Sequence, residues 1–447
     1  MIWKNLGIVA ILFLILGTFV YFYEVEGGKK REEAEEKAKK LFPFEKDAIT
    51  AITLSRSNST IALQKNDDMW NLVQPIEVKA DKSTAESLAS DFGSAKVERS
   101  LESNPIDWKA FGLERPGIKV MLTTKNNKTF NVDFGDKDFN DSSVFAKIPG
   151  QEKILILPSS LLTNTEKNLF DFRDKVVLNF DKDQVNELKI LFKRKKYHLE
   201  KNGEDWSIQQ PIQARADRSK VSSLLSDLDF ARVEEFIEHK NTNSKNYGLK
   251  RPMAKVQLYL GENKAEKSLL IGKKVDSQYY AKDVTRKDVF KIKEDLVEKL
   301  NLDLITLRDK KMVHFERSEV KQISVKLPKN NFEFIRGSDD KWKLNKPEGY
   351  KENSLLEYKL FWPLEDLEGK EIDDQINLNN PKYGFQDPSA EITIVKKDSQ
   401  ATTILLGKKE GDLIFGKTVS DPTLYKLDKK ILEDLNFKID DIIEQSK

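Results

Sequence analysis

The hexapeptide W-N-L-V-Q-P at residues 70–75 returns as W-S-I-Q-Q-P at 206–211 and as W-K-L-N-K-P at 342–347. The tryptophans lie 136 residues apart in both steps, and the prolines keep the same spacing. Self-similarity at a fixed period indicates that one structural unit occurs several times along the chain. The fold of the 447-residue chain is therefore decided by one unit of about 135 residues that is present three times.

Three further residue columns keep this period and predict where a helix and a turn lie. An Asp or Asn ahead of a helix accepts hydrogen bonds from the amides of the first turn. A Gly followed by Leu or Phe fits a left-handed C-cap, and the Pro behind it starts an extended segment. The columns are Asp81, Asp217 and Asn353 for the N-cap, Gly112, Gly248 and Gly384 for the C-cap, and Pro116, Pro252 and Pro388.

The apolar residues of each unit change from an alternating to a helical spacing. Alternating runs precede each tryptophan and continue through the hexapeptide, which predicts a three-stranded meander that ends at the proline. Further strands follow the glycine column, and a second helix is expected to begin near Pro158 in the first unit. Behind the N-cap column, apolar residues recur at i, i+3, i+4 and i+7. This stripe is Ala85, Leu88, Ala89 and Phe92, then Val221, Leu224, Leu225 and Leu228, and in a degraded form Glu357, Leu360, Phe361 and Leu364.

These patterns predict an α+β fold, with a single N-terminal transmembrane helix followed by three tandem repeats. Each repeat is expected to be an antiparallel β-sheet with two helices, because segregated strands and helices do not fit a parallel, doubly wound sheet. Where the repeats join, the triplets Arg173-Asp174-Lys175 and Arg308-Asp309-Lys310 predict a salt bridge. The expected segments are an anchor at 1–24, a charged helical stalk at 25–43, and repeats at 44–178, 179–313 and 314–447, the third of which has diverged.

Residues 6–23 form a run of 18 residues without a charge. As a helix this run is about 27 Å long, close to the roughly 30 Å of a bilayer core. Because no A-x-A site follows it, an uncleaved anchor in the lipid bilayer of the inner membrane is favoured over a cleaved signal peptide. The basic residues behind the run favour a cytoplasmic C-terminal region. Acids alternate with these bases, however, and we expect a single-pass protein whose C-terminal region is periplasmic.

The composition and the absence of known motifs argue against nucleic-acid binding, metal binding and catalysis. Charged residues make up 34% of the chain, but the net charge is only +2, so no nucleic-acid partner is expected. The chain has no Cys, and its three histidines, His198, His239 and His314, show no ligand spacing. Residues 136–141 resemble half of a calcium loop, but Asp141 stands at the sixth position and Lys147 at the twelfth. We predict no catalytic, cofactor-binding or metal-ligating residue.

The tryptophan column allows two interpretations. Aromatic rings exposed on a sheet could stack on sugars, whereas a Trp flanked by apolar strand residues usually packs in the core. Because the residue two places behind each Trp is Leu or Ile and lies on the same strand face, the sequence favours core packing.

With these columns, the chain resembles a bacterial family known as domain of unknown function 4340. The resemblance rests on W-x-L/I-x-x-P, on Ala80-Asp81 and Ala216-Asp217, on Y/F-G-L-x-R-P, and on strands such as Tyr280-Ala281-Lys282. It covers Phe44 to about Ile443, and the third repeat departs from it at Glu352-Asn353 and Asp387-Pro388. The resemblance implies a membrane-anchored envelope protein associated with ABC-type transport systems of the gliding-motility kind. It carries over no catalytic residue.

Two classes of function remain open at this stage. The first is a membrane-anchored, non-enzymatic envelope scaffold or accessory protein that contacts an ABC-type permease complex, because chemistry rarely needs three similar copies. The alternative is a periplasmic module that binds a glycan or a peptide in grooves between the repeats. An envelope hydrolase is a weaker third option, which would need a cluster of acids and a His in one cleft.

Overall fold

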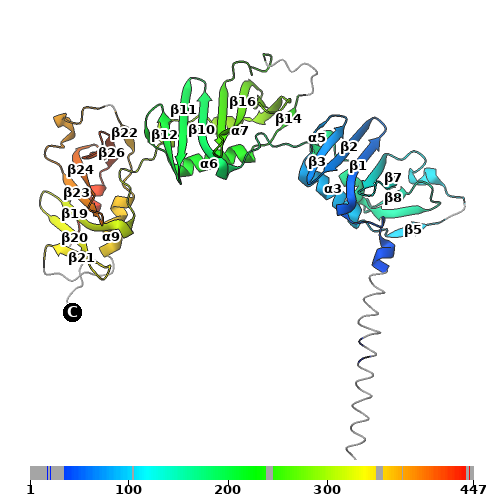
Figure 1. The fold of residues 1–447 in the computed structure, drawn as a ribbon, viewed down its shortest axis with the longest axis horizontal. Helices are drawn as coiled ribbons and strands as arrows, with labels where there is room; N and C mark the ends of the chain where they lie inside the picture. The colour runs from blue at the N-terminus through cyan, green and yellow to red at the C-terminus, as the bar shows by residue number, and fades with distance from the viewer. Residues whose placement is uncertain are drawn as a thin grey trace, which may run out of the picture. The chain divides into compact units, whose positions relative to one another are not determined.

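The computed structural model (Figure 1) describes residues 35–102, 105–237, 245–348, 356–374 and 376–438, together with Thr18, Tyr21 and Ile442. Within these ranges, no helix is both long and apolar enough to cross a membrane. The predicted anchor lies outside the described residues apart from Thr18 and Tyr21, and so do His239 and Asn353. By its internal contacts the chain divides into two compact units, residues 1–176 with 232–236 and residues 177–231 with 237–447.

The described residues of the first repeat fold into one antiparallel sheet of nine strands in the order β4-β3-β2-β1-β6-β7-β8-β9-β5. The predicted meander is confirmed, and a short fourth strand, β4, extends it. A second meander joins the first where β6 pairs with β1. The strands are β1 (Ile49–Arg56), β2 (Ser59–Asn66), β3 (Met69–Gln74), β4 (Val78–Lys79), β5 (Arg99–Leu101), β6 (Ile118–Thr124), β7 (Thr129–Lys137), β8 (Ser143–Lys147) and β9 (Ile154–Pro158).

The second repeat has the same strand order, β13-β12-β11-β10-β15-β16-β17-β18-β14. Its strands are β10 (Val185–Phe192), β11 (Lys195–Asn202), β12 (Asp205–Gln210), β13 (Ala214–Arg215), β14 (Glu235–Phe236), β15 (Ala254–Leu260), β16 (Ala265–Val275), β17 (Gln278–Asp283) and β18 (Phe290–Lys293).

The described residues of the third repeat form eight strands that follow the same path, in the order β21-β20-β19-β23-β24-β25-β26-β22. Three antiparallel sheets with helices therefore confirm the α+β repeats. The strands are β19 (Val320–Lys326), β20 (Asn331–Arg336), β21 (Trp342–Lys346), β22 (Glu371–Asp373), β23 (Ala390–Lys396), β24 (Ala401–Glu410), β25 (Leu413–Thr418) and β26 (Leu424–Asp428).

The α-helices stand at corresponding places in the first two repeats, and among the described residues of the third repeat α9 and α10 correspond to the first two of them. The second helix of the first repeat begins directly behind Pro158, as predicted. The helices are α3 (Lys82–Ser94), α4 (Ser159–Thr165), α5 (Leu169–Phe172), α6 (Arg218–Phe230), α7 (Glu294–Lys299), α8 (Leu304–Leu307), α9 (Leu356–Glu365) and α10 (Ile431–Asp434). The described part of the chain also contains the short 3-10 helices η2 (Lys46–Ala48), η3 (Trp108–Phe111), η4 (Lys182–Gln184), η5 (Arg317–Glu319) and η6 (Pro381–Tyr383).

Helices α3 and α6 turn their predicted apolar stripes into the core, where all eight stripe residues are buried. Their caps are also as predicted: the Asp81 carboxylate accepts from the Thr84 amide, and Asp217 accepts from the amides of Ser219 and Lys220. In α9 the predicted stripe is wrong at Glu357, which is exposed, while Leu356 is buried. Burying an unpaired carboxylate costs far more free energy than exposing it, so the apolar neighbour faces the core.

The three tryptophans lie in the cores of their own repeats. Trp70 is 1% exposed, and Trp206 and Trp342 are each 6% exposed. The core interpretation is therefore confirmed, and each tryptophan strand ends before a proline that follows a cis peptide bond. The glycines of the C-cap column have positive φ angles of 68° to 76°. That conformation is open to Gly because it has no Cβ.

The arginine of each R-D-K triplet is buried and contacts a side chain elsewhere in the sequence. The predicted ion pair is present at Arg308, whose Nη1 and Nη2 lie 2.5 and 2.8 Å from the two carboxylate oxygens of Asp374. Arg173 is buried, and its guanidinium lies 3.5 Å from the centroid of the Phe236 ring, which is a cation–π contact. Each triplet thus has a structural role, because removing a partner of a buried charge leaves that charge uncompensated.

Candidate functional site

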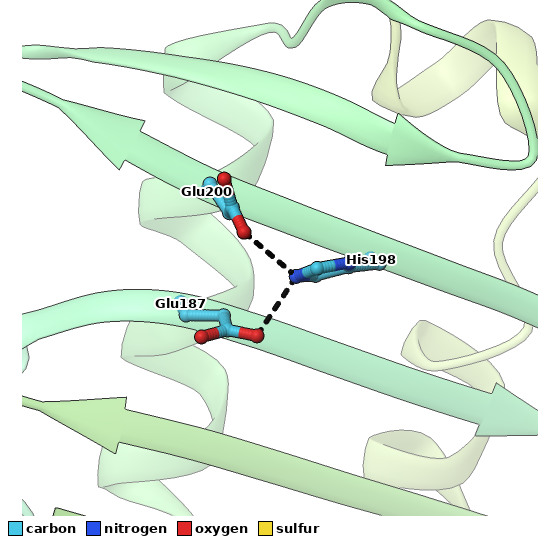
Figure 2. Close-up of side chains that lie close together, drawn as sticks. All are labelled: Glu187, His198 and Glu200. Carbon is cyan, nitrogen blue, oxygen red and sulfur yellow. Dashed lines mark ion pairs between the residues drawn. The ribbon is translucent and has the colours of Figure 1, made fainter. Parts of the chain in front are cut away.

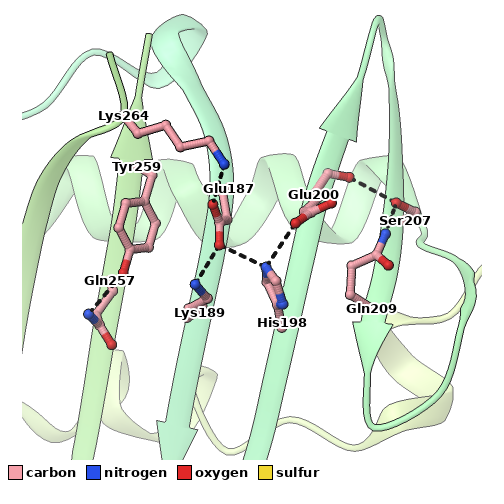
Figure 3. A network of polar contacts seen from close by, with 9 residues as sticks. All are labelled: Glu187, Lys189, His198, Glu200, Ser207, Gln209, Gln257, Tyr259 and Lys264. Carbon is pink, nitrogen blue, oxygen red and sulfur yellow. Dashed lines mark hydrogen bonds and ion pairs between the residues drawn. The ribbon is translucent and has the colours of Figure 1, made fainter. Parts of the chain in front are cut away.

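The second sheet has one apolar face and one polar face. In β10, Leu188 and Ile190 are buried in the core with α6, whereas Glu187 and Lys189 point to the opposite face, because successive strand residues alternate. Polar side chains from β11, β12 and β15 continue this second face (Figure 3). We call it the open face of the sheet.

Glu187, His198 and Glu200 come together on this open face (Figure 2). In the β10–β11 pair, Glu187 stands opposite Glu200, and His198 stands opposite Lys189. The His198 Nε2 atom lies 2.8 Å from Glu187 Oε1 and 3.3 Å from Glu200 Oε1. One ligand atom of each residue lies within 4.8 Å of the other two, so the three form a possible donor set for a divalent metal ion.

Two lysines already compensate the charge of Glu187 (Figure 3). Lys189 Nζ lies 2.5 Å from Glu187 Oε1, and Lys264 Nζ lies 3.4 Å from Glu187 Oε2. Burial alone would raise the pKa of Glu187, but the hydrogen bonds from Lys189 and Lys264 and the charge of Lys189 outweigh it and hold that pKa below its ordinary value. The cluster is therefore charge-balanced by its own side chains, and a metal ion would have to compete with two ammonium groups.

The cluster belongs to the second repeat alone. The same positions of the first and third sheets have the same cross-strand register. They are occupied by Ala51, Ala62 and Gln64 in the first repeat and by Gln322, Glu333 and Ile335 in the third. A site that only one of three copies carries is a local specialisation and does not define the fold.

Sequence reasoning missed this cluster, since it judged the histidines by their spacing along the chain. The signal that could have found it is the pairing of β10 with β11, which brings Glu187, His198 and Glu200 to one face. His314 lies elsewhere, with its Nε2 2.5 Å from Asp309 Oδ2. In the segment that resembles a calcium loop, Asp138 accepts from the Ser143 amide, which orders the turn between β7 and β8.

The second repeat also carries a pocket of about 760 Å³ at its Y-G-L-K-R-P segment. The pocket lies where this segment passes β16 and the start of β17. It is lined by Lys245, Gly248, Lys250, Arg251, Met253, Gly272, Lys273, Lys274 and Tyr279. Five of these nine lining residues are basic and none is acidic, which gives the pocket a concentrated positive charge.

Close backbone packing shapes this pocket. The Lys273 amide donates to the Tyr247 carbonyl at 2.9 Å, and a Cβ on Gly272 would collide with the same oxygen. Gly135 and Gly407 lie against the carbonyls of Phe111 and Tyr383 in the same way. In all three repeats, then, a strand glycine packs against the carbonyl of the aromatic residue that precedes the C-cap glycine, and we call this arrangement the backbone frame. The side chains on this frame decide what it can bind.

One family model matches the chain, and its description is Domain of unknown function (DUF4340). It matches three times, at residues 70–207, 206–361 and 358–446. The first match begins at Trp70 in β3 and ends in β12 of the second sheet, whereas the second begins at Trp206 in β12 and ends in α9. The comparison with curated proteins gave no match.

The similar solved structures include two crystal structures of the DNA polymerase sliding clamp of Pseudomonas aeruginosa. Each is 8% identical, covers 88% of this chain and 94% of its own, and has a TM-score of 0.15. A Ca²⁺-stabilized adhesin of an Antarctic bacterium is 6% identical, with coverages of 87% and 83% and a TM-score of 0.08. At these TM-scores neither likeness bears on the function of this chain.

Proposed function

Because the chain belongs to the family described as Domain of unknown function (DUF4340), we propose that its three repeats form a membrane-anchored, non-enzymatic scaffold of the cell envelope. The observation that carries this proposal is the threefold use of one sheet with a buried tryptophan in each copy. Three copies of one unit enlarge the surface that a partner protein can contact, whereas catalysis needs one set of groups around one reacting atom. The partner would be an ABC-type transport complex in the inner membrane.

The polar cluster of the second sheet supports a non-enzymatic function. Glu187, His198 and Glu200 lie on the face of a sheet and neutralise one another together with Lys189 and Lys264. A general acid or base needs a pKa tuned toward the working pH, but the pKa of Glu187 is held below its ordinary value. The cluster therefore has the character of a structural ion-pair network.

Affinity purification of the full-length chain from native membranes in mild detergent would test the proposal. We expect the permease and ATPase subunits of one transport complex to co-purify with it. A matched variant whose residues 1–24 are replaced by a cleavable export signal should lose most of this association. Recovery of the full-length chain without transporter subunits would contradict the proposed partner.

The topology of the protein needs a separate test. An alkaline phosphatase fused behind Lys447 should be active, because this reporter works only outside the cytoplasm. A fluorescent reporter that folds only in the cytoplasm should be dark at the same position. The opposite pair of results would contradict a periplasmic C-terminal region and favour the orientation indicated by the basic residues behind the anchor.

A ligand-binding module remains the second candidate, and the pocket at the Y-G-L-K-R-P segment favours it. The pocket lies within the second repeat, whereas the sequence placed ligand binding in grooves between repeats. Its charge also points to a different ligand class from the glycan or peptide first considered.

A further inference from the structure

The pocket of the second repeat gathers positive charge that the fold itself does not require. Lys245, Lys250, Arg251, Lys273 and Lys274 line it, and Glu294 pairs with Lys274 from α7. Like charges that converge on a concave surface repel one another and raise the local potential. Such an arrangement is stabilised by a bound anion, which turns the repulsion into attraction.

The other two repeats give a direct control, because the same backbone frame carries different charges there. At the five aligned positions the first repeat has three basic and two acidic residues, Lys109, Glu114, Arg115, Asp136 and Lys137. The third repeat has two basic residues, one acidic and two uncharged, Pro381, Gln386, Asp387, Lys408 and Lys409. The concentration of charge is therefore a feature of the second repeat and not a consequence of the fold.

The shape of the pocket points to an organic anion and not to a bare ion. A volume of about 760 Å³ lies within the range of sites for small organic ligands. Met253 and Tyr279 are half-buried and offer apolar surface beside the charges. The ring centroid of Tyr279 lies 5.9 Å from Lys274 Nζ, so the site offers an aromatic surface directly beside a cationic group.

We propose that this pocket binds a phosphorylated molecule with at least two negative charges. The planar guanidinium of Arg251 presents paired donors that match two phosphoryl oxygens, and the lysines act as point charges around them. The carbon skeleton of the ligand lies against Met253 and Tyr279. This inference is independent of the proposed scaffold function, since it needs neither the anchor nor a transport complex.

A phosphoryl group in this pocket could come from a soluble phosphate ester or from a lipid headgroup. Two probes distinguish these sources: phenyl phosphate, which is a soluble phosphate ester, and a short-chain phosphatidic acid below its micellar concentration. Calorimetry on the full-length chain in nanodiscs of neutral lipid would measure both affinities. Stronger binding of phenyl phosphate supports a soluble ligand, and stronger binding of phosphatidic acid supports a headgroup; saturable binding of either one supports the site.

Charge removal at aligned positions tests the location of binding. Arg251→Gln and Lys273→Gln should each weaken binding about tenfold or more, as expected for the loss of a charge-assisted hydrogen bond. The matched variants Arg115→Gln in the first repeat and Lys408→Gln in the third should leave the affinity unchanged. All four side chains are exposed, so thermal unfolding should be unaltered and confirms that each variant is folded.

Two results would overturn the proposal. One is the absence of saturable binding of both probes to the unaltered protein at millimolar concentration. The other is an equal loss of affinity in the second-repeat variants and in the matched variants, because binding would then follow the overall charge of the chain and not this pocket.

Discussion

The first and second repeats each form a sheet with the same strand order, but the side chains outside the core differ between them. Both follow one strand order, and both bury a tryptophan and a capped helix against it. On the open face, however, the first repeat has Ala51 and Ala62 where the second has Glu187 and His198. At the basic pocket the first repeat mixes acids with bases. The difference teaches that the residues of the tryptophan core preserve the fold, while positions outside that core differ between the repeats and can acquire separate roles.

The largest expected effect is a loss of stability when the core tryptophan that both repeats share is replaced. Trp206→Ala should lower the stability of the second sheet by about 3–5 kcal/mol, because it removes a large core side chain and leaves a cavity. Trp70→Ala should have a similar effect on the first sheet and should also remove the hydrogen bond from the indole to Glu86, which is 2.9 Å long. Amide hydrogen exchange of the full-length chain would measure the loss of protection in each sheet separately.

The control for this prediction is Trp362→Ala, because the Trp362 side chain is 51% exposed on α9. Its effect should stay within about 0.5 kcal/mol, as for most surface substitutions. If Trp206→Ala and Trp362→Ala reduced protection equally, the tryptophan column would not be the core anchor of the repeats.

The parts of the fold that could be predicted from the sequence are those that depend on neighbours along the chain. The burial of the tryptophans, the caps at Asp81 and Asp217 and the strand ends before the prolines all follow from local patterns. Repetition strengthened each of these predictions, since one pattern was seen three times. The third repeat shows the limit: the pattern predicts Glu357 as the first residue of the stripe, but Leu356 is buried in its place, because this repeat no longer matches the other two there.

The rest depends on residues that are far apart in the sequence. The pairing of β5 with β9 joins strands more than 50 residues apart, and no local pattern indicates it. The cluster around His198 needs the register of β10 against β11, which an alternating pattern leaves open. The basic pocket needs the Y-G-L-K-R-P segment to lie beside β16, so its lysines cannot be grouped from their positions in the sequence.

A second prediction tests the backbone frame that all three repeats share at the pocket. Gly272→Ala should destabilise the second sheet by about 1–3 kcal/mol, because its Cβ would meet the Tyr247 carbonyl and the backbone would have to move. Gly117→Ala is the matched control, since a Cβ there has open space and the residue precedes β6 at an exposed position. Its stability should be unchanged or about 1 kcal/mol higher.

Hydrogen exchange of the two variants would measure this comparison. Gly135→Ala and Gly407→Ala should behave like Gly272→Ala, because each glycine lies against the carbonyl of the corresponding aromatic residue. If Gly272→Ala were as stable as the unaltered protein, the close packing of β16 against the Y-G-L-K-R-P segment would not be needed, and the shared frame would lose its support.

The smallest expected effect concerns the open face, where the first and second repeats differ. The pKa of Glu187 is lowered in the folded chain, so its carboxylate stabilises the second sheet above the pKa of the unfolded state, about 4.3. This contribution is lost as the pH falls through the folded pKa. Glu187→Gln should therefore be less stable than the unaltered protein near neutral pH, and the difference should shrink in acid. Hydrogen exchange of β10 and β11 as a function of pH would measure it.

The matched change in the first repeat is Ala51→Gln, which places the same amide at the aligned position where there is no lysine pair to lose. Its effect on the first sheet should be the same at every pH, because no ionisable group is removed. A pH-independent difference for Glu187→Gln as well would mean that Glu187 contributes through packing and hydrogen bonds alone. The open face of the second repeat would then differ from that of the first in shape and not in its electrostatics.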